Sequence, residues 1–247
     1  CTVENTAITS VKNSKEHAYI GGIIGGTSMN DTEPCYAQIT GCKVIDSTLE
    51  ASAYGIGGIV GYADEKSTVT KSKMTGNVTV STGSAQMLCQ VGGVVGMTEG
   101  TVTANEMAGD LKFSSGISHI VAGGITSSLP AKTVASNNSF MGKVTLGGSS
   151  SNVILGGLYG SVSSDRNFDN ASDKSVTIGS ISIDSYQNAA TTEIFAGGFV
   201  GKMQPGYALA FKGYDCQTNI SLDQTVNQRK ASYICLGGVL GGCNPET

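Results

Sequence analysis

The chain has 247 residues, of which 14% are charged, and a formal net charge of −4; it contains 35 Gly, 4 Pro and no Trp. Its 15 basic and 19 acidic residues are scattered, so no run of like charge could follow a nucleic-acid backbone. No window approaches the ~20 uninterrupted apolar residues of a membrane-spanning helix, and we expect neither a nucleic-acid partner nor a membrane-spanning segment.

The first residues already match a repeat. Residues 1–3 (Cys-Thr-Val) have the register of residues 42–44 (Cys-Lys-Val), and the chain does not open with a basic-then-apolar signal sequence. A lipidated Cys1 is an alternative, although a polar linker normally follows a lipid anchor. Neither end of the chain has the polar pattern of a cap, and exposed strand edges need covering. We therefore expect the natural protein to continue beyond one or both ends.

The strongest pattern is a pair of glycines followed by two residues that are usually apolar. Subtracting the positions of successive first glycines gives spacings of 36, 35, 31, 33, 41 and 40 residues, a period typical of stacked supersecondary units. A nucleotide-binding loop occurs once, before a helix, so these glycines indicate repeated close backbone approach instead. The seven pairs are Gly21 and Gly22, Gly57 and Gly58, Gly92 and Gly93, Gly123 and Gly124, Gly156 and Gly157, Gly197 and Gly198, and Gly237 and Gly238.

Two further elements complete each unit. A weaker one is best seen in residues 69–74 and 102–107, which precede Gly76 and Gly109. The other alternates apolar with polar residues, and a period of two residues predicts a strand. Its apolar pairs are Val78 and Val80, Leu111 and Phe113, Val144 and Leu146, Ile181 and Ile183, and Ile220 and Leu222.

These elements predict an all-β fold. Three short strands in one unit fit one turn of a coil whose strands stack on those of the next turn at the ~4.8 Å sheet spacing. We predict a β-solenoid, a right-handed parallel β-helix of about seven coils of roughly 36 residues with three strands each, as a single domain over residues 1–247. The right hand is taken from the general behaviour of such coils.

The cysteines have no CxxC spacing, which argues against a zinc site. We interpret most of them as buried thiols that act as small hydrophobic residues. The alternative is a disulfide within one of the two close pairs, Cys35 with Cys42 or Cys235 with Cys243.

The units resemble Glug repeats, which begin with Gly-Gly-apolar-apolar-Gly and continue through a turn to a Gly-Asn-Val-type strand. Residues 57–62 (Gly-Gly-Ile-Val-Gly-Tyr) lead to 76–80 (Gly-Asn-Val-Thr-Val), and 92–96 (Gly-Gly-Val-Val-Gly) lead to 109–111 (Gly-Asp-Leu). The resemblance covers nearly the whole chain and departs in the fourth unit, where Ser127 replaces the final glycine. It implies a large secreted or surface-attached bacterial protein of adhesin type, without catalytic residues.

The fifth and sixth units are the longest, and insertions at one corner of a solenoid commonly carry its function. Acidic residues in the fifth insertion lack the ligand spacing of a helix-loop-helix calcium site, which favours a solvated turn. Aromatic residues in the sixth could stack on sugars; the alternative is that their rings fold inward to seal a wider coil. Because consecutive coils are neighbours, we predict one binding site formed by Asp165, Arg166, Asp169, Tyr207, Phe211 and Tyr214.

Catalysis has little support in the sequence. His17 and His119 are the only histidines, and neither lies beside a nucleophile and carboxylate. The outward positions between the apolar pairs change from Thr79 through Lys112 to Ser221, which is too irregular for ice or crystal-surface binding.

We expect an extracellular or cell-surface scaffold for adhesion or structure, non-catalytic and without cofactor or metal. Its expected partner is a host or neighbouring-cell glycan or surface protein, or further repeats of the same protein. The alternatives are a polysaccharide lyase or hydrolase of the β-helix type and a self-assembling filament or stalk segment.

Overall fold

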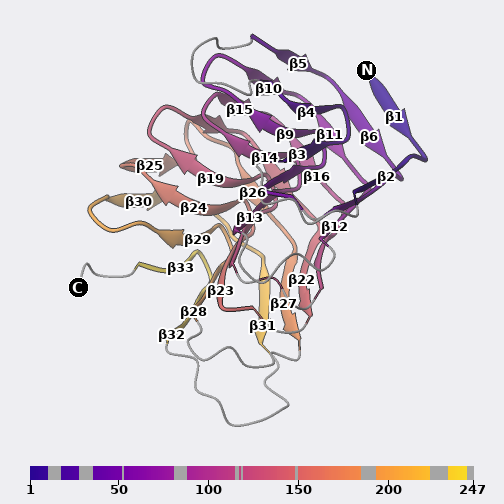
Figure 1. The fold of residues 1–247 in the computed structure, drawn as a ribbon. Helices are drawn as coiled ribbons and strands as arrows, with labels where there is room; N and C mark the ends of the chain where they lie inside the picture. The colour runs from indigo at the N-terminus through magenta and orange to yellow at the C-terminus, as the bar shows by residue number, and fades with distance from the viewer. Residues whose placement is uncertain are drawn as a thin grey trace.

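The computed structural model describes residues 1–10, 18–27, 36–51, 53–80, 88–114, 117, 119–147, 150–184, 193–222 and 233–243. Over these residues the chain forms 33 short strands and no helix (Figure 1). Neighbouring strands within each sheet run parallel. The predicted all-β class is therefore confirmed.

Three sheets of seven strands form most of the molecule. Sheet 2 contains β2 (Ala7–Ser10), β7 (Thr48–Ala51), β12 (Asn77–Val80), β17 (Leu111–Phe113), β22 (Lys143–Gly147), β27 (Ser180–Asp184) and β31 (Asn219–Leu222). Sheet 3 contains β3 (Tyr19–Gly21), β8 (Gly55–Gly57), β13 (Leu88–Gly92), β18 (His119–Gly123), β23 (Asn152–Gly156), β28 (Glu193–Gly197) and β32 (Tyr233–Gly237). Sheet 4 contains β4 (Ile24–Gly26), β9 (Val60–Ala63), β14 (Val95–Thr98), β19 (Thr126–Pro130), β24 (Tyr159–Ser163), β29 (Val200–Met203) and β33 (Leu240–Cys243).

Three smaller sheets complete the architecture. Sheet 1 contains β1 (Thr2–Glu4), β6 (Lys43–Ile45), β11 (Lys73–Met74), β16 (Glu106–Met107), β21 (Ser139–Phe140) and β26 (Val176–Thr177). Sheet 5 contains β5 (Gln38–Thr40), β10 (Thr68–Thr70), β15 (Thr101–Thr103) and β20 (Val134–Ser136), and sheet 6 pairs β25 (Arg166–Asp169) with β30 (Leu209–Lys212).

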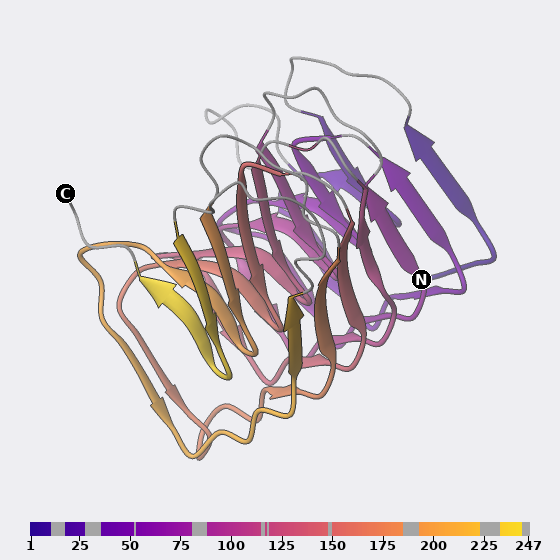
Figure 2. The ribbon, with the colours of Figure 1, turned by 90° about the horizontal axis from the view of Figure 1, so that it is seen from below.

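Strands that follow one another in the chain lie in different sheets, and the order of sheets repeats. We call each passage through them a rung: rung 1 is β1–β4, rung 2 is β5–β9, rung 3 is β10–β14, rung 4 is β15–β19, rung 5 is β20–β24, rung 6 is β25–β29 and rung 7 is β30–β33. Figure 2 shows the rungs as successive layers, with colour running in order from one end of the stack to the other.

The prediction of three strands per unit is wrong, since rungs 2 to 6 have five each. Two of the predicted elements are divided by corners. The Gly92–Gly93 pair ends β13 and begins the bend before β14. Lys71, at φ 52°, and Ala104, at φ 56°, separate the strands of residues 68–74 and 101–107 in the same way.

The predicted register of the alternating strands is confirmed. Val78 aligns with Leu111, Leu111 with Val144 and Val144 with Ile181, and these four residues are fully buried. The first glycines of all seven pairs align in sheet 3, from Gly21 to Gly237. Residues 1–3 align with 42–44 as expected.

The second glycine of the first six pairs permits close approach between rungs. A Cβ on Gly58 would lie 2.1 Å from the carbonyl oxygen of Gly93 and 2.8 Å from Cγ of Met74. Any larger residue would therefore push neighbouring rungs apart. In the fourth unit, Ser127 occupies the place of a third glycine; its side chain is buried and its hydroxyl donates a hydrogen bond to Oε1 of Gln90.

The core is a series of apolar columns, one side chain from each rung. Stacking alike residues in this way buries a continuous apolar surface, so each rung depends on its neighbours. Among the described residues no helix is long and apolar enough to cross a membrane.

Candidate binding lobe

The two long insertions lie together, as the sequence predicted for consecutive units. β25 pairs with β30 in parallel, with Arg166 opposite Leu209 and Asp169 opposite Lys212. In Figure 2 these strands form an arm that extends from the last rungs, away from the remaining sheets. We call residues 164–175 and 204–215 the lobe.

The three charged residues of the predicted site hold the lobe in place. Arg166 is half-buried; its Nε donates to Oγ of Ser164 at 2.8 Å and its Nη2 donates to the carbonyl of Pro130 at 2.6 Å. Asp165 accepts a hydrogen bond from the backbone N–H of Ala208 at 2.8 Å. Pro130 ends β19 of rung 4 and Ala208 directly precedes β30 of rung 7, so these bonds connect rung 6 to both and give the side chains structural partners.

Asp169 closes the turn that follows β25. Its Oδ1 accepts the N–H of Ala171 at 2.9 Å, and its Oδ2 lies 3.3 Å from Nζ of Lys212 on the next rung. The hydrogen bond from Ala171, followed by that from Lys212, lowers the pKa of the Asp169 carboxyl. The carboxylate is therefore ionised at neutral pH and acts as a hydrogen-bond acceptor rather than as an acid.

Two of the three predicted aromatic residues face inward. The ring of Phe211 stacks on that of Phe168 with centroids 5.2 Å apart, and Tyr214 packs edge-on against Phe199 at 4.9 Å. Phe211 and Tyr214 are partly buried against the core, which is the inward packing considered above as the alternative. The third, Tyr207, is 42% exposed to solvent.

Sequence reasoning missed the inner half of this cluster. Phe168 is 4% exposed and Phe199 is 1% exposed, and both contact Phe211. Phe168 lies opposite Phe211 in the register of β25 and β30. Aligning the two insertions with each other, rather than reading each alone, would have revealed this aromatic pair.

A buried polar group supports the lobe from within. Asp173 is 8% exposed, and its Oδ1 accepts bonds from the N–H of Asn137 at 2.7 Å and the N–H of Ser175 at 2.9 Å. Nearby, Nδ2 of Asn138 donates to Oη of Tyr159 at 3.2 Å. Burial raises the pKa of the Tyr159 phenol, so this hydroxyl stays protonated.

The arrangement offers few groups for catalysis or metal binding. Nδ1 of His119 lies 2.7 Å from Nδ2 of Asn152, whereas His17 lies outside the described residues. Within the described ranges, no group of three or more His, Cys, Asp or Glu side chains could hold a metal ion.

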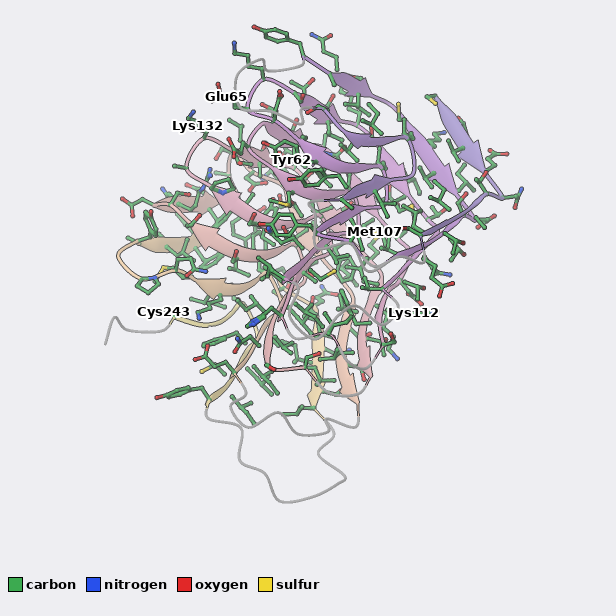
Figure 3. All side chains as sticks on the ribbon, viewed as in Figure 1. Tyr62, Glu65, Met107, Lys112, Lys132 and Cys243 are labelled. Carbon is green, nitrogen blue, oxygen red and sulfur yellow. The ribbon has the colours of Figure 1, made fainter. Side chains whose placement is uncertain are left out.

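A second exposed aromatic residue lies away from the lobe. Tyr36 is 71% exposed, and its hydroxyl is 2.8 Å from Nζ of Lys66. Near it, Glu65 and Lys132, both labelled in Figure 3, form an ion pair between the turns of separate rungs. Nζ of Lys132 lies 2.5 Å from Oε2 of Glu65. The pair raises the pKa of Lys132 and lowers that of Glu65, but such exposed pairs add little stability.

The six described cysteines are free thiols. Only Cys42 and Cys89 are buried, and burial raises the pKa of Cys89 to about 12. The interpretation that most of the cysteines are buried is therefore wrong for the described residues, since Cys1 and Cys243 are exposed and Cys216 and Cys235 are intermediate. Cys235 and Cys243 are not joined, and Cys35 of the other possible disulfide lies outside the described residues.

The comparisons with known proteins give no relative. No family model matches the chain, and no curated protein and no solved structure matches it.

Proposed function

We propose that this chain is a non-catalytic scaffold, outside the cell or on its surface, whose lobe binds a glycan or a protein. In this proposal the rungs are the coils of a right-handed β-solenoid that forms one domain. The observation that carries it is the alignment of seven glycine pairs in one register, because it makes a regular stack of rungs from one end to the other. The resemblance to Glug repeats supports the surface location.

The lobe is the best place for a ligand because its backbone is fixed while Tyr207 remains exposed. Asp165 accepts the N–H of Ala208, the residue after Tyr207, and so ties this turn to the rung before it. An aromatic ring held by rigid backbone presents a flat apolar face with a polar tip, which suits stacking on a sugar or anchoring a protein.

Binding arrays of glycans and extracellular proteins test this proposal. We expect the chain to bind at least one ligand and Tyr207→Ala to weaken that binding by at least about tenfold, the loss typical of a central aromatic contact. Tyr36→Ala is the matched control, since it removes a more exposed tyrosine far from the lobe, and should bind as the unmodified chain does.

Absence of any ligand, or equal losses from both substitutions, would contradict a binding role for the lobe. Acidic polysaccharides on the same array are checked for cleavage products. Turnover that falls with Asp165→Asn or Asp169→Asn would instead identify a polysaccharide lyase or hydrolase.

A further inference from the structure

The turn before β30 holds Tyr207 in a fixed place beside a carboxylate. Gly206, the third residue of the turn formed by residues 204–207, has a φ of 83°, which is the left-handed conformation that a type II turn requires at its third position. The backbone N–H of Ala208 then donates to Oδ1 of Asp165 at 2.8 Å. The Asp165 carboxylate therefore lies against the peptide bond that joins Tyr207 to Ala208.

The other charged side chains of the lobe have partners inside the protein. Its three cations all donate hydrogen bonds: Arg166 to Ser164 and Pro130, Lys174 to the carbonyl of Asn170, and Lys212 to Asp169. Two further carboxylates are also bonded, since Asp173 accepts the N–H groups of Asn137 and Ser175, and Asp215 accepts a bond from Nε2 of Gln217 at 3.0 Å. These charges are therefore already engaged in holding the lobe together.

Asp165 differs from the other charged residues of the lobe. It is exposed, it forms no ion pair with a described residue, and its hydrogen bond to Ala208 uses Oδ1 alone. Oδ2 is therefore left to solvent. Tyr207, which is 42% exposed, likewise stacks on no other described ring. An aromatic ring and an uncompensated negative charge thus adjoin each other on the surface.

This pair of groups favours a positively charged ligand. A carboxylate attracts a cation directly, and the face of a tyrosine ring attracts a cation through its quadrupole. An acidic sugar would be repelled by Asp165, and a neutral sugar would gain nothing from the charge. Lysine and arginine side chains are the cations that a protein surface presents, and both commonly pack on aromatic rings.

We propose that the ligand of the lobe is a protein that presents a lysine or arginine side chain, whose cationic group binds between the Tyr207 ring and Oδ2 of Asp165. This inference rests on the proposed binding role of the lobe and narrows its ligand from a glycan or a protein to a basic protein.

Tetramethylammonium chloride probes this site directly. With the ionic strength held constant by NaCl, we expect it to shift the NMR resonances of the Tyr207 ring in a saturable manner. Its uncharged analogue tert-butanol should leave these resonances unchanged at the same concentrations. Asp165→Asn should weaken the response to tetramethylammonium by about threefold, the size expected for an exposed charge pair. This substitution removes the charge and keeps a side-chain oxygen that accepts the N–H of Ala208.

Asp215→Asn is the matched control, because it removes the same charge at the other end of β30 and should respond as the unmodified chain does. Equal responses to tetramethylammonium and tert-butanol, or equal responses of the two Asn variants, would overturn the cationic ligand. A neutral glycan that binds through Tyr207 with an affinity unchanged by Asp165→Asn would overturn it too and leave the proposed function intact. A cation response at Tyr207 without any ligand on the arrays would contradict the proposed function alone.

Discussion

Asn138 shows how one side chain joins neighbouring rungs. From rung 5 its Nδ2 donates to the carbonyl of Val102 at 2.8 Å, and its Oδ1 accepts the N–H of Asn105 at 3.0 Å. Asn105 makes the same two bonds to Val69 and Ser72 of rung 3. These buried amides satisfy backbone groups at a corner where the chain leaves the sheet ladder.

Replacing Asn138 should therefore cost more than the loss of one hydrogen bond. Asn138→Ala leaves the N–H of Asn105 and the carbonyl of Val102 buried without these partners, which should lower the free energy of unfolding by about 3 kcal/mol. Urea unfolding measures the change, with Asn167→Ala as control, because Asn167 is exposed on the lobe. Equal stabilities of the two variants would contradict this role of the asparagine.

At the scale of the element, β25 and β30 depend on their aromatic pair. Phe168→Ala removes a ring that stacks on both Tyr159 and Phe211 and should lower stability by about 3–5 kcal/mol. Because a stacked repeat transmits stability mainly to its neighbours, faster hydrogen exchange should concentrate in rungs 6 and 7 and spare β12. Uniformly faster exchange along the chain would argue against this local dependence. Tyr207→Ala is the control and should change hydrogen exchange and stability little.

The strands were predictable where a local pattern carries the information. The alternation of apolar with polar residues, as at Val78 and Val80, predicted which side chains of each strand face inward. The structure confirms the register from β12 to β31. The corners were not predictable because Lys71 and Ala104 adopt a left-handed backbone that their residue types do not signal. The role of Arg166 was hidden for another reason: its acceptor, Pro130, lies 36 residues away.

At the scale of the whole molecule, each rung is stabilised mainly by the rungs next to it along the stack. Each sheet column places one side chain per rung in contact with the rungs before and after it, so every rung except the first and last is covered on both sides. A charge inside one column cannot be solvated without separating two rungs. A charge at an outward-facing position of the same strand is solvated by water.

The most direct test of the stacked rungs compares a lysine at two adjacent positions of β22. Val144 is fully buried in the column of Leu111 and Ile181, whereas Thr145 is opposite the exposed Lys112. We expect circular dichroism on heating to show that Val144→Lys has lost the cooperative transition of the parent chain. Thr145→Lys should melt within a few degrees of the parent, as surface substitutions generally do. A Val144→Lys variant that is soluble, with an unchanged spectrum and melting temperature, would contradict the account.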